Sequence, residues 1–359
     1  MARTQIPYNL DNIDKENANF NLIYGEKSNG KSYQVKHKKA IEKYLKTGRR
    51  FILMRRWDSD LTSSWIESYF SDVDIQKLTN NKYNCVTKFR NELYLTTITE
   101  EFKKKRGEKI GYAIPISLEQ RYSSASFLDV DDIIVEEFMS RGMYIVNEPS
   151  KLMTFYSTVD RKRGTTKLWL VGNTVSRICP YLAEWGLVDI MKNQKQGEIK
   201  TKIIHNEAND VKIAIEYCRS SGGKTMAIGQ ASSMIDKGKW QTDIQPKLPK
   251  SRKSYKCLFR FGFQYQGFKF ICEFLQEKED KKYPCWFIYP FYKEFDEHFI
   301  VFSDTIKISP YWQRDIYNIT IKNDKLKNLF RTFREDIIFY SSDLCGTDFK
   351  QVIDFSIKK

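Results

Sequence analysis

The chain has 359 residues, of which 41% are hydrophobic and 14% aromatic, so it holds enough apolar material for two globular domains of unequal size. This composition excludes a largely disordered chain. Sixty lysines and arginines against forty-five aspartates and glutamates give a net charge of +15. That excess favours a partner with a phosphate backbone or an anionic surface.

Cysteine usage and hydropathy limit the cellular locations in which the protein is expected. Seven cysteines are scattered along the chain without a C-x-x-C pair, a pattern that predicts reduced thiols in a cytoplasm. No stretch approaches the roughly 18 consecutive apolar residues of a membrane span, and residues 1–14 lack the apolar run of a signal peptide. We therefore expect a protein that is neither secreted nor bound to a membrane.

Strands and helices alternate over the first part of the chain. The apolar run at 20–24 leads into a glycine-containing loop, and residues 31–46 follow with helical spacing. This alternation predicts an α/β domain over 1–210, with a mainly parallel sheet covered on both faces. The further elements expected in chain order are a strand at 50–54, a helix at 63–70, a hairpin of 84–89 and 92–98, strands at 111–117 and 132–135, a helix at 151–163 and a strand at 167–171.

The pattern changes near residue 210. A helix-like stretch at 211–219 and a polar segment that follows it predict a linker or lid subdomain over 211–252. Aromatic-rich strands at 257–265 and 268–275 flank Gln266-Gly267, which is a hairpin signal. A small α+β domain over 253–359 is then completed by strands at 286–289 and 298–302 and a helix at 324–340.

The loop after the first strand matches G-x-x-x-x-G-K-[ST] in a strand, loop, helix context. Glycines let the backbone wrap a phosphate, Lys31 reaches the β and γ phosphates of ATP, and Ser32 ligates Mg²⁺. The alternative is a chance glycine-rich turn before a basic helix. The motif predicts a site for ATP and Mg²⁺ formed by Gly25, Glu26, Lys27, Ser28, Asn29, Gly30, Lys31 and Ser32.

A second apolar strand, at 132–135, ends in the adjacent carboxylates Glu136 and Glu137. A phosphoryl-transfer site needs one oriented carboxylate for the metal and a group that positions the attacking water. We expect Glu136 to lie near Mg²⁺ and Glu137 to be the catalytic residue near the γ-phosphate. The alternative is an exposed acidic pair at a strand end.

Three more residues are candidates for the same site. Arg161, after a predicted helix, is the candidate arginine finger that would act on the nucleotide of a neighbouring subunit; a solvated basic turn is the alternative. Asn173 follows the strand at 167–171, in the position of a polar sensor of the γ-phosphate; the alternative is a turn residue. Tyr8 is a candidate to stack on the adenine ring.

Three basic clusters are candidate contacts with a nucleic-acid backbone: Lys36 with Lys38 and Lys39, Lys103 to Lys109, and Lys247 to Lys253. Solvated faces are the alternative for each. In the second domain, a two-metal nuclease would need carboxylates that converge at one end of a sheet. The strand at 257–265 carries none, so a working nuclease is disfavoured.

With these residues placed, the chain resembles the DNA-packaging ATPases of phi29-like podophages, a terminase-related branch of the P-loop motors. The likeness covers most of residues 15–190 and is faint beyond about 210. It rests on the P-loop and, in the family's order, on Phe51 to Arg56, Gly111 to Ser117, Thr158 to Arg163, Gly172 to Ser176 and Cys179 to Tyr181.

The resemblance implies a RecA-like ATPase domain, a linker or lid subdomain, and an RNase H-like C-terminal domain without nuclease residues. It also implies a homo-pentameric ring in the host cytoplasm, docked on the portal of an empty prohead and driving double-stranded DNA inward with ATP. A packaging RNA can bridge motor and portal in that family. Glu136 stands where the family has Asp, and Ser123, with Arg121 nearby, stands where it can show a trans-acting Lys, so we prefer Arg161 to Arg121 as the trans residue.

Other functions stay open at this point. A terminase large subunit with an active nuclease domain is the nearest alternative, and a replication helicase or loader is the next. A scaffold that binds ATP without turnover is a third. A GTPase is disfavoured because the chain has no N-K-x-D segment for guanine.

Overall fold

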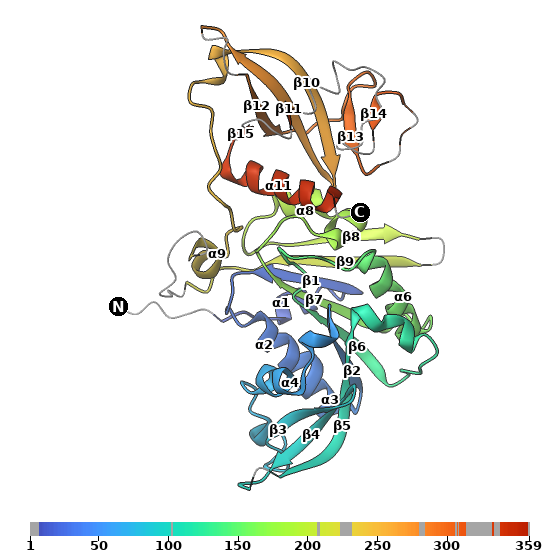
Figure 1. The fold of residues 1–359 in the computed structure, drawn as a ribbon. Coiled ribbons are helices and arrows are strands. Elements are labelled where there is room, and N and C mark those ends of the chain that lie inside the picture. Colours follow the sequence, from blue (N-terminus) through green and yellow to red (C-terminus); the bar gives the residue numbers. More distant parts are fainter. Residues whose placement is uncertain are drawn as a thin grey trace. The chain divides into compact units, whose positions relative to one another are not determined.

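The computed structural model describes residues 7–101, 103–206, 209–222, 232–279, 284–305, 307, 309–313, 332–333 and 338–357. The chain divides into two compact units (Figure 1). The first consists of Met1–Val175 with Ile190–Trp240, and the second of Ser176–Asp189 with Gln241–Lys359. The sequence did not indicate that a short segment before residue 190 belongs with the second unit.

A nine-stranded sheet, in the order β3-β4-β5-β2-β6-β7-β1-β9-β8, forms the centre of the first unit. From β5 to β9 in this order all neighbours are parallel, whereas β3, β4 and β8 are antiparallel additions at the two ends. The predicted mainly parallel sheet is confirmed. Its strands are β1 (Phe20–Gly25), β2 (Arg50–Arg55), β3 (Cys85–Phe89), β4 (Glu92–Ile98), β5 (Lys104–Pro115), β6 (Val130–Glu136), β7 (Lys167–Asn173), β8 (Ile199–His205) and β9 (Asp210–Tyr217).

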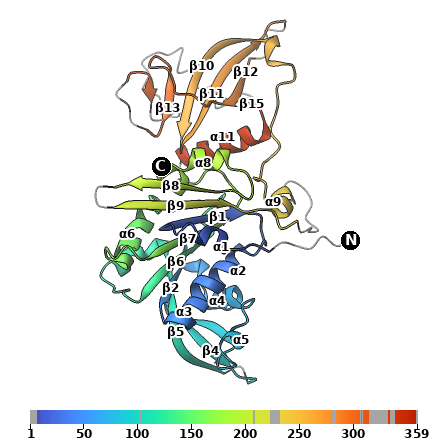
Figure 2. The ribbon, with the colours of Figure 1, turned by 180° about the vertical axis from the view of Figure 1, so that it is seen from behind.

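Helices cover both faces of this sheet, with α2, α3 and α4 on one face and α6 on the other (Figures 1 and 2). The core under α2 to α4 joins Val35, Ile41 and Phe70 to the inward-facing strand residues Leu53 and Trp169. The helices of this unit are α1 (Asp11–Asp14), α2 (Lys31–Val35), the π-helical turns Lys36–Glu42, α3 (Lys43–Thr47), α4 (Ser63–Phe70), α5 (Ile75–Leu78), α6 (Glu148–Asp160) and α9 (Ser232–Lys237), with 3₁₀ turns at Asp58–Asp60 and Ile116–Tyr122; α8 (Val188–Asn193) begins in the second unit and ends in the first.

The helix predicted at 211–219 is wrong, because this segment forms strand β9. β9 pairs with β1 on one side and β8 on the other, so its residues 213–217 are buried on both faces of the sheet. Burial on both faces removes the alternation of polar and apolar residues that would identify a strand. The sheet therefore continues beyond the boundary expected near residue 210.

A six-stranded sheet, in the order β14-β13-β10-β11-β12-β15, forms the second unit. The predicted hairpin is confirmed: β10 and β11 are antiparallel around Gln266 and Gly267, whose φ angles of 51° and 74° suit a tight hairpin turn. The elements are β10 (Tyr255–Tyr265), β11 (Phe268–Glu277), β12 (Cys285–Pro290), β13 (Val301–Ser303), β14 (Trp312–Gln313), β15 (Ile338–Tyr340), α7 (Pro180–Glu184), α11 (Asp343–Ile357) and a 3₁₀ turn at Arg252–Ser254.

The C-terminal helix predicted at 324–340 lies largely outside the described residues. Its last three residues form strand β15, which pairs in parallel with β12, so the prediction is wrong there. Helix α11 follows β15, and the sequence did not predict it. In the described part of the chain no helix is both long and apolar enough to cross a membrane.

Candidate functional site

The Gly25–Ser32 loop joins β1 to α2, as the motif predicts. Gly30 has a φ of +92°, a left-handed conformation that costs glycine nothing. A Cβ on Gly25 would lie 2.8 Å from the Cβ of Cys218, so glycine is also required there for close packing. Asn29 links the loop to the N-terminal segment, since its carbonyl accepts a 3.1 Å hydrogen bond from the Tyr8 amide. Lys27 and Ser28 are exposed.

The side chain of Lys31 is buried and folds back onto the loop. It donates to the carbonyl of Glu26 at 2.6 Å and to Oδ1 of Asn173 at 2.6 Å. Burial lowers the pKa of Lys31, and the nearby thiol of Cys218 and carboxylates of Glu136 and Glu26 oppose this. The structure thus brings Asn173, at the end of β7, to the loop lysine.

Glu136 ends β6 and lies beside the loop hydroxyl. Its Oε2 accepts a hydrogen bond from Ser32 Oγ at 3.0 Å, and its Oε1 accepts one from Tyr69 Oη at 2.6 Å. Burial raises the pKa of the Glu136 carboxyl, while these two hydrogen bonds lower it. A hydroxyl and a carboxylate within hydrogen-bond distance are oxygen donors of the kind that Mg²⁺ selects, so the residues present fit the expected metal.

Glu137 differs from its neighbour in exposure and in backbone. Its side chain is 60% exposed and forms an ion pair with Arg55 at the end of β2. Its φ is +58°, a left-handed conformation that L-residues with side chains seldom adopt. The turn sends Glu136 and Glu137 to different surroundings, one buried against Ser32 and one open to solvent.

Comparisons with known proteins place this arrangement in a family. The model of the podovirus DNA encapsidation protein (Gp16) family matches residues 3–280. The chain belongs to this family. The predicted likeness to phi29-like DNA-packaging proteins is therefore confirmed.

Relatives and solved structures agree with this membership. The DNA packaging protein of Bacillus phage phi29 is 27% identical over 251 residues, 69% of either chain. That of Bacillus phage B103 is 32% identical over 176 residues, which are 48% of this chain and only 50% of that protein. A chain of the solved bacteriophage phi29 viral genome packaging motor assembly has the same fold: it matches with a TM-score of 0.57 at 20% identity, over 98% of this chain and 99% of that one.

Arg161, the expected trans residue, lies away from the loop of its own chain. It follows α6 and precedes β7, so it lies at the amino edge of the parallel strands, whereas Gly25, Glu136 and Asn173 end strands at the carboxyl edge. Its guanidinium is exposed and donates to the Ala125 carbonyl at 2.8 Å. The structure thus does not bring Arg161 to the site within one chain.

A second basic residue at the site escaped the sequence analysis. Arg56 donates from Nε to Glu148 at 2.7 Å and from Nη2 to the Phe138 carbonyl at 3.2 Å. Phe138 follows Glu137, so Arg56 fixes the turn that carries the acidic pair. Two arginines in succession at the end of a buried strand were the available signal, and Arg55 and Arg56 both contact this turn.

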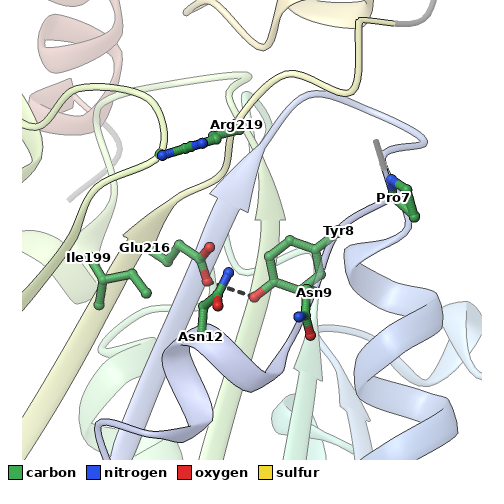
Figure 3. A pocket seen from close by; sticks show the side chains of 8 residues that line it. Pro7, Tyr8, Asn9, Asn12, Ile199, Glu216 and Arg219 are labelled. Carbon is green, nitrogen blue, oxygen red and sulfur yellow. Dashed lines mark hydrogen bonds between the residues drawn. The ribbon is translucent and has the colours of Figure 1, made fainter. Parts of the chain in front are cut away.

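A cavity of about 450 Å³ opens beside the loop (Figure 3). Its lining includes Tyr8 and Asn12 of the N-terminal segment, Ile199 of β8, Glu216 of β9, and Arg219, which follows β9. Tyr8 Oη donates to Glu216 Oε2 at 2.7 Å, and burial raises the pKa of Glu216 to about 7. The hydroxyl of Tyr8 is thus engaged with a carboxylate, while its amide bonds Asn29 of the loop.

Ion pairs engage most of the three basic clusters that the sequence indicated. In the second cluster, Lys104 pairs with Glu67 and Lys109 with Glu92. Lys105 and Arg106 have no carboxylate partner among the described residues, and the Arg106 guanidinium lies 3.9 Å from the centre of the exposed Phe89 ring. In the other two clusters, the pairs are Lys36 with Asp72, Lys38 with Asp11, Lys39 with Asp14, Lys247 with Asp343, Lys250 with Glu277 and Arg252 with Glu273.

In the second unit, no group of three or more His, Cys, Asp or Glu residues suited to a metal occurs within the described ranges. The buried carboxylate on the β10–β11 hairpin, Glu273, is paired with Arg252 at 2.8 Å and accepts a hydrogen bond from Tyr289 at 3.3 Å. Asp348 of α11 is paired with Arg177. Each of these two carboxylates is paired with an arginine, and the two are not paired with each other.

Proposed function

We propose that this protein hydrolyses ATP at the carboxyl edge of its first sheet and uses the energy to translocate double-stranded DNA into a viral prohead. One observation carries the proposal: the loop residues Lys31 and Ser32 are hydrogen-bonded to the ends of two other strands, at Asn173 and Glu136. P-loop, acidic strand and sensor strand meet at one place, as phosphoryl transfer requires. The names of the phi29 and B103 relatives, DNA packaging proteins, supply the process.

Each residue of the proposed site has a role that its surroundings support. The loop amides and the Lys31 ammonium bind the β and γ phosphates. Ser32 and Glu136 would hold Mg²⁺, which when bound neutralises charge on the phosphate oxygens. Asn173, already bonded to Lys31, senses the γ-phosphate. Glu26 through Gly30 contribute the backbone of the cradle.

Glu137 is the proposed catalytic residue that orients the attacking water. Its carboxylate is exposed and is held by Arg55, so it is accessible to water and fixed in direction. Glu136 is buried and lies against Ser32 and Tyr69, a position that suits a metal ligand better than a residue open to the attacking water. The left-handed backbone at Glu137 keeps the two carboxylates apart.

The cavity beside the loop is the proposed pocket for the base of ATP. It adjoins the loop through the bond between Tyr8 and Asn29, on the side of β1 away from the acidic strand β6. Tyr8 offers a ring, and Asn12 and Glu216 offer hydrogen-bonding groups for an adenine edge. Tyr8 then lines this pocket, with its hydroxyl engaged by Glu216.

The proposed assembly is a homo-oligomeric ring, which the family resemblance implies to be a pentamer, and the place of Arg161 supports it. Because Arg161 lies at the opposite edge of the sheet, it can complete a site only in a neighbouring copy, where a guanidinium would neutralise charge on the transferred phosphoryl group. The ring would dock on the prohead portal in the host cytoplasm, with a packaging RNA as a further partner. Lys105 and Arg106 are the proposed contacts with DNA phosphates, since no carboxylate in the described part of the chain pairs with them.

The second unit is proposed to be an RNase H-like domain without nuclease activity. Its order β12-β11-β10-β13-β14, with antiparallel β10 to β12 and parallel β13 and β14, supports that fold. The pairing of Glu273 with Arg252 speaks against a two-metal site. A terminase with an active nuclease stays the alternative, which Mg²⁺- or Mn²⁺-dependent DNA cleavage by the full chain would establish; strand separation stimulated by single-stranded DNA would instead indicate a helicase.

The test of this function is steady-state ATP hydrolysis with and without linear double-stranded DNA, across protein concentration. We expect Glu137→Gln to lower turnover by about 10²- to 10⁴-fold while ATP binding persists. Turnover of the wild type should rise with protein concentration as rings form. A wild type that binds ATP but never hydrolyses it, with DNA and proheads present, would make the protein a scaffold rather than a motor.

A mixing experiment tests the trans role of Arg161. Lys31→Ala destroys a subunit's own site and Arg161→Ala destroys its contribution to a neighbour, so each variant alone should be inactive. In an equal mixture, about one site in four combines an intact loop with a neighbour that carries Arg161, and about a quarter of wild-type turnover should return. Mixing Lys31→Ala with the double variant is the matched control and should restore nothing. Normal turnover by Arg161→Ala alone would refute the assignment.

A further inference from the structure

The chain leaves the first unit across the phosphate-binding loop. Trp240 is the last residue of that unit, and its ring lies 5.4 Å from that of Tyr24, which directly precedes Gly25. The carbonyl of Lys239 accepts a 3.2 Å hydrogen bond from Thr174, which directly follows the sensor Asn173. Residues 232–240 are here called the exit segment. This segment therefore contacts Tyr24, just before the loop, and Thr174, just after Asn173.

Gly238 brings the exit segment directly onto the loop. Its φ is +61°, and a Cβ at this position would lie 2.8 Å from the amide nitrogen of Glu26 and 3.1 Å from its Cβ. The carbonyl of Gly238 accepts a 2.7 Å hydrogen bond from Tyr217 at the end of β9. Only a residue without a side chain allows this approach, so the exit segment and the backbone of Glu26 are packed together.

Glu26 is held from both of its ends. Its carbonyl accepts the Lys31 ammonium at 2.6 Å. Its carboxylate, on a residue only 2% exposed, accepts hydrogen bonds from Ser220 Oγ and from the Ser221 amide, both at 2.6 Å. Ser220 Oγ also lies 3.3 Å from the carbonyl of Asp236 in the exit segment. One residue thus connects the phosphate-binding lysine to the segment that leads out of the unit.

We propose that Glu26 is the positioning residue through which phosphate binding at the loop loosens the exit segment. The inference rests on the ATP site proposed above. A phosphate would draw the Lys31 ammonium away from the Glu26 carbonyl, and its negative charge would repel the Glu26 carboxylate in a poorly screened interior. Both effects weaken the hold of Glu26 on Ser220 and Ser221. Because coupling is reciprocal, freeing the exit segment by mutation must tighten nucleotide binding.

The experiment is amide hydrogen exchange of the full chain, followed in the peptide covering 232–240, with and without a non-hydrolysable ATP analogue and Mg²⁺. In the wild type we expect the analogue to speed exchange of this peptide by about 5-fold, as a coupling of typical size would. Glu26→Ala should exchange fast in both states and bind the analogue about 5-fold more tightly. In Glu26→Gln the amide oxygen can still accept from the Ser221 amide, and the NH2 group can donate to Ser220 Oγ, so contacts to both serines persist without the charge. This variant should stay slow without nucleotide and respond less than the wild type.

Two further variants keep the result interpretable. Lys237→Ala removes an exposed side chain within the exit segment and should behave as the wild type. Ser220→Ala acts from outside the loop and should speed exchange without nucleotide, which decides the matter if Glu26→Ala does not fold. Nucleotide binding is measured on the same samples with a fluorescent ATP analogue. A wild type that binds nucleotide with unchanged or slower exchange at 232–240 overturns the coupling and leaves the ATP site standing, whereas a wild type that binds no nucleotide overturns both.

Discussion

The two edges of the first unit's sheet both hold buried charges, but they satisfy them with different partners. At the carboxyl edge, Lys31 and Glu136 bond to the side chains of Asn173 and Ser32. At the amino edge, Arg163 donates to the backbone carbonyls of Leu128, Val130 and Val159. A phosphate could replace the Asn173 amide and the single Glu26 carbonyl that Lys31 contacts without unfolding the sheet, whereas release of Arg163 would break hydrogen bonds to three carbonyls on two segments. The number of backbone groups that a charged side chain holds together, more than its burial, separates a binding site from a structural network.

Asp160 illustrates the amino edge further. It accepts hydrogen bonds from the amides of Gly164 at 2.9 Å and Thr166 at 3.1 Å. Burial alone would raise the pKa of Asp160, but these backbone hydrogen bonds outweigh it and hold the pKa below its usual value. The turn between α6 and β7 is therefore fixed from within, and it presents Arg161 on a rigid support.

The largest effect should come from Lys31 at the carboxyl edge. Lys31→Ala removes the ammonium that we propose binds the β and γ phosphates, and we expect ATP turnover to fall by at least about 10²- to 10³-fold. Lys46→Ala is the control: it removes a side chain of α3 that is 72% exposed, and this variant should turn over ATP normally. If Lys31→Ala kept turnover within about twofold of the wild type, the carboxyl edge would not be the reaction site.

The next effect concerns the amino edge and is one of stability. Arg163→Ala removes hydrogen bonds to the carbonyls of Val130 and Val159 and one of the two guanidinium donors to the Leu128 carbonyl, which also accepts from Arg49. We expect the first unit to lose about 3 kcal/mol of unfolding free energy. Urea denaturation followed by the exchange of β6 and β7 amides measures it. Turnover per folded molecule should be unchanged. Arg161→Ala removes an exposed side chain with a hydrogen bond to the Ala125 carbonyl and should cost less than about 1 kcal/mol. Equal losses in the two variants would break the distinction between them.

The smallest effect is a pH dependence from the cavity beside the loop. Burial raises the pKa of Glu216 from its ordinary 4.5 to about 7. Below about 4.5 the carboxyl is protonated in both the folded and the unfolded chain, so its burial costs no charge. As pH rises toward 7 the unfolded chain ionises first, and the folded state loses stability until both are ionised.

Glu216→Gln should remove this dependence. The variant should match the wild type near pH 4.5 and be more stable at pH 8, as thermal unfolding across this range can measure. Glu100→Gln, at an exposed position, is the control and should track the wild type throughout. If Glu216→Gln were no more stable at pH 8 than at pH 4.5 relative to the wild type, the carboxylate would be solvated and the cavity open.

Local sequence predicted what local chemistry determines. The glycines and Lys31 of the loop, the apolar strand that ends in Glu136, and the Gln266-Gly267 turn each adopt the expected structure, because a turn or a strand end needs those residue types there. The order of the strands was not predicted, since pairing depends on contacts distant in sequence. Strand β9 was mistaken for a helix for the same reason: its neighbours β1 and β8, not its own pattern, make it a strand.

For the site, sequence predicted the members but not their partners. Nothing in the motif indicates that Tyr69 bonds Glu136 or that Ser220 and Ser221 bond Glu26, because these contacts join segments 67 and about 200 residues apart. Arg161 lies at the opposite edge because it precedes β7, which runs parallel to β1. A sequence motif specifies the chemical groups at the end of one strand, whereas the order of the strands in the sheet decides which strand ends lie next to each other.

The backbone of Glu137 has a consequence for how the chain can change. A left-handed conformation costs a residue with a side chain about 1 kcal/mol or more compared with glycine, and Glu137 adopts it at a φ of +58°. Selection for folding alone would therefore favour glycine at this position. With the catalytic role proposed for Glu137, the strained backbone is a cost in stability that activity would require, and a thermostability screen that ignores activity would be expected to remove this glutamate first.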